Sequence, residues 1–396
     1  MATIERLESL PRVQFGRTDM MVSRACGGTM MWGTLNKEER MAHEQLDALV
    51  EQGVNFIDTA ELYPVPFEGG KVTEEWIGHW LEGALAAKKI QRDQFYIATK
   101  ANPSNNGAPD MKGRKKPWGF DQESLLASCK ASIERLKCQY IDLYYLHWPT
   151  RNVPVFGCIS YFPDKNRPVP SFDKGEVKDF EAQVLAIKAL FDAGLIKHWA
   201  LSNENNYGVT MLCLTCDRLN VPRPVCVQND YSLNNRIFDT DCYEACHRFG
   251  LVSCHFGLLC GGVLSGKYIR DSPYAKKDPG RDLGECRHHA RPNFQPRYSY
   301  PMPAKATERY VVLAEKYGLT PTELAVAWAN QRPHAGAVII GTTTKRQVEE
   351  CVGACKIKAL PKELLAEIDQ THEEFRNPNM HFVSKDLISN APWLSR

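Results

Sequence analysis

One short apolar run ends in a carboxylate and is followed by a tyrosine: Val54-Asn55-Phe56-Ile57-Asp58-Thr59-Ala60-Glu61-Leu62-Tyr63. A run of this length is typical of a strand that is buried on both faces. Asp58, at the end of the strand, and Tyr63, on the turn after it, can face one pocket. The pattern recurs along the chain, where Lys100 and His147 end two later apolar runs.

Eight such runs alternate with segments of helical periodicity. Strands that alternate with helices predict a parallel sheet, and eight repeats favour a closed (β/α)8 barrel over an open doubly wound sheet. No G-x-G-x-x-G motif follows a strand, which argues against a Rossmann domain. We expect strands at residues 25–30, 54–58, 95–100, 141–147, 199–203, 225–228, 251–256 and 337–340.

An N-terminal hairpin and three long connections complete the predicted fold. Residues 13–23 read as a β-hairpin with its turn at 16–19. The connections follow strands, so they lie at the C-terminal face of the barrel, and they cover residues 101–120, 149–178 and 257–303. We expect helices from about residue 179 and over 240–249 and 304–317. The whole chain, 1–396, is expected to be one domain, with a core at about 13–375 and a tail at 376–396.

Composition narrows the function classes. The chain has 396 residues, 43% of them hydrophobic, and a formal net charge of +2, which gives no reason to expect nucleic acid or an anionic membrane as partner. No apolar run approaches the roughly 20 residues of a spanning helix, and Glu5 and Glu8 argue against a signal peptide. The expected location is the cytoplasm, or an organelle if a targeting segment is missing. The 14 scattered cysteines are expected to be free thiols.

Four side chains at successive strand ends form a set that can reduce a carbonyl group. Each of these residues alone would be more typical of a structural role. In a barrel, however, all four face the same pocket at the C-terminal end: Asp58, Tyr63, Lys100 and His147. Tyrosine can donate the proton, and a neighbouring lysine cation is expected to lower its pKa from about 10. Asp58 would hold the ammonium, and His147 would bond the substrate oxygen. No side chain donates hydride, so a nicotinamide cofactor is expected.

The sequence resembles the aldo-keto reductase family. The resemblance covers roughly residues 13–375 and rests on segments 15–18, 53–63, 145–149, 201–203, 265–268 and 340–343. The segments at 63–66 and 146–149, with the long insert before residue 179, look most like the bacterial Tas-type branch. Potassium-channel beta subunits are more distant relatives, and they carry asparagine where this chain has His147. The resemblance implies that Asp58, Tyr63, Lys100 and His147 form the catalytic tetrad.

The resemblance also implies a binding site for NADP(H). Phe256 would stack on the nicotinamide ring, Lys267 would face the pyrophosphate, and Arg281 would bind the 2′-phosphate. Cys351 stands where relatives have asparagine, and Gly257 stands where they have serine. The remaining positions implied to hold the cofactor are Thr29, Met30, Asp58, Ser202, Asn203, Gln228, Thr343, Gln347 and Glu350.

The leading hypothesis is therefore a monomeric or weakly associated reductase of small aldehydes or ketones that uses NADPH. The runner-up is a nucleotide-binding module that senses redox state without significant turnover, as the channel subunits suggest. A lyase or isomerase of the same fold would bind no nicotinamide. Phe156, Tyr161, Phe162 and Phe172 suggest an apolar lid, although a packed surface loop explains them equally well.

Three other patterns have ordinary explanations. Cys213 and Cys216 form a C-x-x-C motif inside a predicted helix, which favours chance thiols over redox chemistry. Cys286, His288 and His289 lack a second ligand pair, so no metal site is expected. The basic run at 112–116 is most simply a solvated loop.

Overall fold

Eight parallel strands form a closed barrel in the computed structural model, which describes residues 4–65, 72–103, 120–151, 153–161, 174–270, 272–275, 282–292 and 294–380. Neighbouring strands follow the chain order and the last strand closes on the first, as β10-β3-β4-β5-β6-β7-β8-β9. The predicted (β/α)8 barrel is confirmed. Each strand falls within or overlaps a predicted run: β3 (Ala25–Gly28), β4 (Phe56–Asp58), β5 (Tyr96–Ala101), β6 (Ile141–Leu146), β7 (Ile196–Ser202), β8 (Cys226–Gln228), β9 (Val252–His255) and β10 (Ala335–Gly341).

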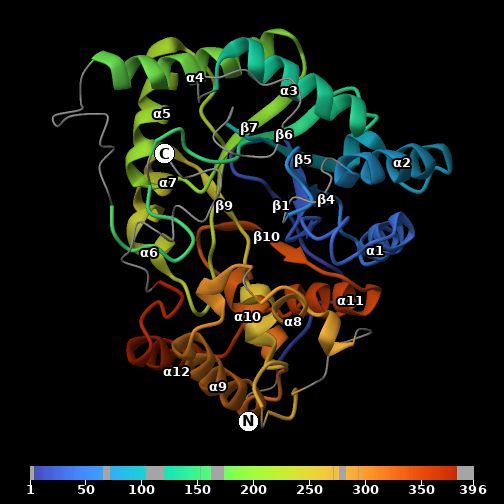
Figure 1. Cartoon of the computed structure of the whole chain (residues 1–396), viewed down its shortest axis with the longest axis vertical. Helices are drawn as coiled ribbons and strands as arrows, with labels where there is room; N and C mark the ends of the chain where they lie inside the picture. Colours follow the sequence, from blue (N-terminus) through green and yellow to red (C-terminus); the bar gives the residue numbers. More distant parts are fainter. Residues whose placement is uncertain are drawn as a thin grey trace.

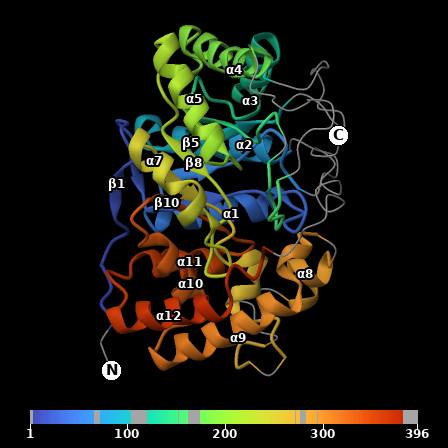
Figure 2. The same ribbon diagram turned by 90° about the vertical axis from the view of Figure 1, so that its left-hand side faces the viewer.

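Helices surround the strands (Figure 1). Local signals set several of their ends: the Asp121 side chain caps α3 by accepting the Ser124 N–H, and Gly250 ends α7 in the left-handed conformation. Figure 2 shows α4 and α5 at the opposite end of the molecule from α9 and α12. The helices are α1 (Glu39–Glu51), α2 (Val72–Ala86), α3 (Gln122–Arg135), α4 (Lys174–Asp192), α5 (Asn206–Leu219), α6 (Ile237–Asp241), α7 (Tyr243–Phe249), α9 (Pro301–Lys316), α10 (Pro321–Asn330), α11 (Lys345–Cys355) and α12 (Lys362–Glu374).

The predicted N-terminal hairpin closes one end of the barrel. Its strands, β1 (Arg12–Gln14) and β2 (Met21–Ser23), pair antiparallel. Phe15 and Met20 at the turn are buried and belong to the same apolar cluster as inward-facing barrel residues such as Phe56. In Figure 2, β1 lies on the opposite side of the molecule from α8 (Arg287–Ala290), which follows the C-terminal end of β9. The hairpin thus covers the N-terminal end and leaves the C-terminal face for function.

The connections at the C-terminal face contain more structure than the sequence predicted. The segment after β9 was predicted only as a long connection, but it includes α8 and three 3-10 helices, η2 (Cys260–Ser265), η3 (Leu283–Glu285) and η4 (Pro296–Tyr298). Helix α4 begins at Lys174 rather than near residue 179, and the helix expected at 240–249 is divided into α6 and α7. The basic run at 112–116, Phe162, Phe172 and the tail from residue 381 lie outside the described residues.

The cysteines agree with a core built without disulfides. All 14 cysteines are free, as predicted, and all but Cys138 are buried. Cys213 and Cys216 lie in α5, where burial raises the pKa of both thiols, that of Cys216 to about 12.

In the part of the chain that the structure describes, no helix combines the length and apolar character needed to cross a bilayer. The same residues contain no cluster of three or more potential metal ligands.

Candidate active site

Two adjacent strands carry an ion pair to the C-terminal end of the barrel. Asp58 is the last residue of β4, and Lys100 lies one residue before the end of β5. Because β4 and β5 are parallel neighbours, both side chains project from the same end of the sheet. Lys100 Nζ lies 2.5 Å from Asp58 Oδ2, and the lysine side chain has no solvent exposure. The pair is therefore fully buried.

The Lys100 ammonium uses its three N–H donors on three neighbours. Besides Asp58, it donates to the Thr59 carbonyl oxygen at 2.8 Å and lies 3.4 Å from Tyr63 Oη. An ammonium has three donors and no acceptor, so its hydrogen-bonding capacity is filled. Gln228 Nε2 donates a hydrogen bond to the other carboxylate oxygen, Asp58 Oδ1, at 2.8 Å. Of the three hydrogen-bond partners of this cation, one is a phenol, that of Tyr63.

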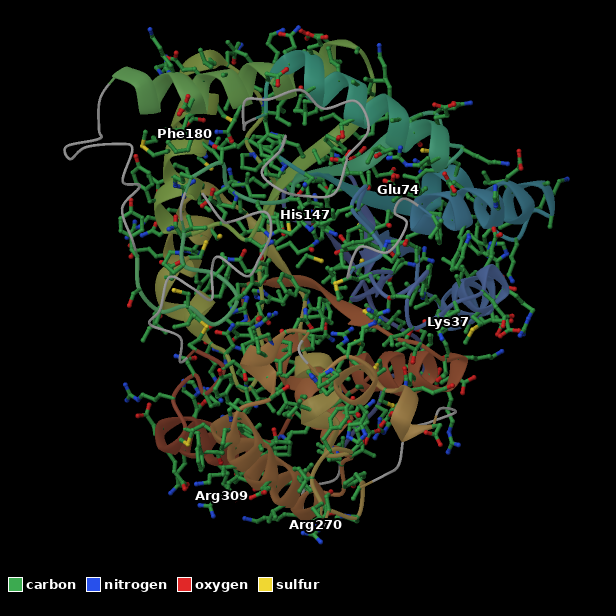
Figure 3. The ribbon with its side chains drawn as sticks, in the orientation of Figure 1. Lys37, Glu74, His147, Phe180, Arg270 and Arg309 are labelled. Carbon is green, nitrogen blue, oxygen red and sulfur yellow. The ribbon has the colours of Figure 1, made fainter. Side chains whose placement is uncertain are left out.

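Tyr63 and His147 complete the group. Tyr63 lies on the turn after β4, and His147 directly follows β6. Their rings meet edge to face with centroids 5.9 Å apart, and the His147 ring stacks on Trp148 at 3.6 Å. Figure 3 shows His147 among the inner strands, far from the labelled Arg270 and Arg309 at the periphery. The four side chains predicted to act together thus lie together.

Burial and charge set the protonation states of these groups. Burial raises the pKa of Tyr63 above the ordinary value, although Lys100 pulls it down. For Lys100, burial favours a lower pKa, but Asp58 and Tyr63 outweigh it and the pKa is raised. Burial, aided by the Lys100 charge, holds the pKa of His147 well below the ordinary value. At neutral pH a protonated phenol and a neutral imidazole therefore lie near a lysine cation.

This result corrects one sequence prediction. The sequence led us to expect that Lys100 would bring the pKa of Tyr63 below that of a free tyrosine. The lysine does act in that direction, but removal of the phenol from water acts more strongly in the opposite direction. The sequence shows which charges are neighbours, whereas the extent of burial depends on the folded structure.

A polar group from β7 and β8 lies against the ion pair. Ser202 Oγ donates to the Gln228 carbonyl at 2.9 Å, and Asn203 Nδ2 donates to the His147 carbonyl at 3.0 Å. Asn203 adopts a left-handed backbone conformation with φ of 55°, which asparagine tolerates better than most residues. Ser202, Asn203 and Gln228 are among the residues that the family resemblance implies to hold the cofactor. Their hydrogen bonds place them beside both the Asp58 carboxylate and His147.

A cavity of about 990 Å³ extends from this group to residues of α10 and α11. Of the predicted tetrad, Asp58, Tyr63 and His147 line it, while Lys100 is buried behind them. Arg281 lies outside the described residues. All the other residues predicted to bind the cofactor line the same cavity: Thr29, Met30, Asp58, Ser202, Asn203, Gln228, Phe256, Lys267, Thr343, Gln347, Glu350 and Cys351.

Several cavity-lining residues were missed from the sequence. Arg346 lies in the first turn of α11, next to the predicted Gln347, so its position in that motif was an available signal. Arg287 and Arg297 come from short helices in a segment that was predicted only as a long connection. Arg297 is ion-paired with Asp230 at 2.9 Å, a contact between segments far apart in the chain. No local pattern could have revealed it.

Comparison with known proteins agrees with the geometry. The model of the Aldo/keto reductase family matches residues 25–373. The chain belongs to this family. It is 32% identical to Protein tas of Escherichia coli (strain K12) over 355 residues, which cover 89% of this chain and 94% of the tas protein. It is 26% identical to the uncharacterized oxidoreductase YrpG of Bacillus subtilis (strain 168), covering 88% of this chain and 92% of YrpG.

The predicted resemblance to the Tas-type branch is therefore confirmed. A further relative, the aldo-keto reductase of Babesia bovis, is 29% identical over 266 residues, which cover 65% of this chain and 90% of that protein. Family membership supports an oxidoreductase that acts on small carbonyl compounds with a nicotinamide cofactor.

Proposed function

We propose that this protein reduces aldehydes or ketones with NADPH and that Tyr63 is the general acid. The observation that carries the proposal is the buried Lys100 ammonium, whose three donors are directed at Asp58, the Thr59 carbonyl and Tyr63 Oη. Tyr63 lines the cavity while its cation lies behind it. A phenol supported in this way can release a proton towards the cavity and be stabilised as phenolate.

The cavity suits a dinucleotide in its volume of about 990 Å³ and in the chemistry of its two ends. Near Tyr63, the amides of Asn203 and Gln228 and the Ser202 hydroxyl form a fixed polar surface suited to a carboxamide. Thr343 and Gln347 line the other end and are bonded to each other at 2.8 Å through the Thr343 N–H. We propose that the nicotinamide binds at the first end and the adenosine at the second.

The described cavity lining also suits phosphate groups. It includes the cations Lys267, Arg287 and Arg346. Gly262 has φ of 98°, and a Cβ at this position would meet Lys267 Cε at 2.9 Å, so a glycine leaves room for the lysine beside the backbone. We assign Lys267 to the pyrophosphate. Arg346, at the N-terminal turn of α11, is our structural candidate for the 2′-phosphate, since guanidinium groups bind phosphate in bidentate fashion. Arg281 remains a second candidate, predicted from the sequence alone.

The residues of the site divide the work of carbonyl reduction. A bound reduced nicotinamide supplies a hydride to the carbonyl carbon. Tyr63 Oη holds the proton that the carbonyl oxygen receives, and its raised pKa keeps that proton in place at neutral pH. Lys100 stabilises the phenolate that remains, and Asp58 holds Lys100 in position. Neutral His147, stacked on Trp148, hydrogen-bonds the substrate oxygen.

The wall beside Tyr63 favours an apolar or aromatic carbonyl substrate. Phe156 and Phe294 pack against the cluster that contains Tyr63 and Trp148, and all four line the cavity. The nearby guanidinium of Arg297 is already neutralised by Asp230 and lies 5.1 Å from the Phe156 ring centroid. The wall therefore offers rings rather than an uncompensated charge to the substrate.

Replacement of the phenol hydroxyl tests the proposal. Tyr63→Phe is expected to lower kcat by about 10²–10⁴-fold, the usual contribution of general acid catalysis, while the Kd for NADPH changes less than about twofold. Tyr243→Phe on α7 is the matched control, because the Tyr243 ring contacts do not need the hydroxyl. The assay is a panel of aldehydes and ketones with NADPH and NADH. Unchanged turnover in Tyr63→Phe contradicts the proposal, and tight NADPH binding by the wild type without any reduction favours the redox-sensing module.

A further inference from the structure

A second tyrosine lies inside the barrel next to Lys100. Tyr145 on β6 is the register partner of Lys100 on β5, and it has no solvent exposure. It belongs to the inward-facing apolar cluster of the barrel. Paired residues on neighbouring strands lie side by side, so the Tyr145 side chain lies next to that of Lys100 inside the barrel.

The Lys100 ammonium lies close to two aromatic rings. Its Nζ is 4.9 Å from the Tyr63 ring centroid and 5.7 Å from the Tyr145 ring centroid. Both distances fall within the range of about 6 Å over which a ring face attracts a cation, and the attraction is strongest where water is excluded. Because Asp58, Thr59 and Tyr63 take all three ammonium donors, Tyr145 can act only through its ring face.

The Tyr145 ring is itself fixed in place. Its hydroxyl lies 3.6 Å from the sulfur of Cys226 on β8, and both residues are fully buried. Burial raises the pKa of Tyr145 well above the ordinary value, so the hydroxyl keeps its proton and the ring carries no charge of its own. Tyr145 does not line the cavity, which means that it acts on the reaction only through another residue.

We propose that Tyr145 is a positioning residue for carbonyl reduction, whose ring face holds the Lys100 ammonium against Tyr63. The proposal rests on the function proposed above. Without the Tyr145 ring, the ammonium keeps its hydrogen bonds, its ion pair with Asp58 and the contact with the Tyr63 ring, but the lysine stem gains room to move. The field of Lys100 at Tyr63 Oη then weakens, so the phenol becomes a poorer acid.

This role predicts a specific kinetic change. Tyr145→Leu and Tyr145→Met are each expected to lower kcat by about 30-fold, the scale of one desolvated cation–π contact, with KM and the Kd for NADPH within about twofold of wild type. The charged and titratable groups that face Tyr63 are Lys100, Asp58 and His147. Of these only Lys100 loses support, so the alkaline limb of the kcat profile moves to higher pH.

Two variants separate the ring from its hydroxyl. Tyr145→Phe keeps the ring face and loses only the Cys226 contact, and it is expected to retain at least half of the wild-type kcat and the wild-type pH profile. Cys226→Ala removes the same contact from the other side and is the matched control. If Tyr145→Phe loses as much activity as Tyr145→Leu, the hydroxyl rather than the ring is responsible, and the proposal is overturned.

A fluorinated series at position 145 tests the ring without changing its packing. Phenylalanine with one, two or three ring fluorines, introduced by codon suppression, progressively weakens the attraction for a cation. The expected result is a stepwise fall in kcat with each fluorine, and this series decides even if the Leu and Met variants fail to fold. A flat series means that the ring only fills space and refutes the proposal. Tyr63→Phe is assayed in parallel to distinguish the general-acid role of Tyr63 from the positioning role of Tyr145. If Tyr63→Phe loses turnover while the fluorine series is flat, only the positioning role is refuted.

Discussion

Removal of the Lys100 ammonium is the most direct test of the electrostatics of the site. The distance from Nζ to Tyr63 Oη is 3.4 Å. With an effective dielectric constant of about 20, the attraction between unit charges at this separation is about 5 kcal/mol. That energy stabilises the phenolate left after proton transfer, and it corresponds to between about three and four powers of ten in rate. Lys100→Met is therefore expected to lower kcat by about 10³-fold.

The same substitution also affects stability, which must be separated from catalysis. Lys100→Met leaves the Asp58 carboxylate buried with only Gln228 as a charge-neutral partner, and loss of one member of a buried ion pair costs about 3–5 kcal/mol. In Asp58→Asn/Lys100→Met the buried charge is gone, and the amide oxygen can keep the Gln228 bond. The double variant is therefore expected to regain most of the unfolding free energy and none of the turnover.

Both quantities can be measured on the same samples. Consumption of NADPH at saturating substrate gives kcat, and urea unfolding gives the free energy of unfolding. Lys188→Met is the control, because Lys188 forms an exposed ion pair with Asp192 on α4 and its removal should change neither quantity by much. The reasoning is refuted if Lys100→Met keeps kcat within tenfold of wild type, or if the double variant recovers turnover together with stability.

Two further predictions concern pH and the cofactor. Reduction needs a protonated Tyr63, whose pKa is raised above 10.0, and a neutral His147, whose pKa is lowered well below 6.5, so kcat should stay level throughout the range from pH 6.5 to 10.0 and fall only beyond it; a decline beginning near pH 8 in a stopped-flow pH series would contradict the assignment. Arg346→Ala should raise the Kd for NADPH about tenfold and leave the Kd for NADH unchanged, as measured by fluorescence titration; equal effects on both would remove Arg346 from the 2′-phosphate.

The barrel and most of the site were predictable because they depend on short-range order in the sequence. Each buried strand is an apolar run, and in a closed parallel barrel the ends of all strands meet at one face. Asp58, Lys100 and His147 could therefore be placed together before any distance was known. The residue types then restricted the chemistry, since an acid, a phenol and an ammonium at one rim suit proton transfer.

Features that depend on packing between distant segments could not be predicted. The contact of Tyr145 with Lys100 requires the register between β5 and β6, and in the sequence Tyr145 is one apolar residue among several. Arg297 in η4 reaches Asp230, which follows β8, across a separation of 67 residues in the chain. The direction of the pKa shift of Tyr63 depends on how completely the phenol is buried, which no local pattern contains.

The raised pKa of Tyr63 and the attraction of Lys100 are two consequences of one cause. Exclusion of water holds the proton on Tyr63 before reaction, because a phenolate is poorly solvated there. The same exclusion lowers the local dielectric constant, so Lys100 stabilises the phenolate more strongly once charge develops. Burial thus keeps Tyr63 protonated before the reaction, and it strengthens the stabilisation of the phenolate by Lys100 during proton transfer. A solvated lysine beside a solvated tyrosine would neither keep the phenol protonated in this way nor stabilise its phenolate as strongly. Both effects depend on the full burial of Lys100, whose charge Asp58 compensates.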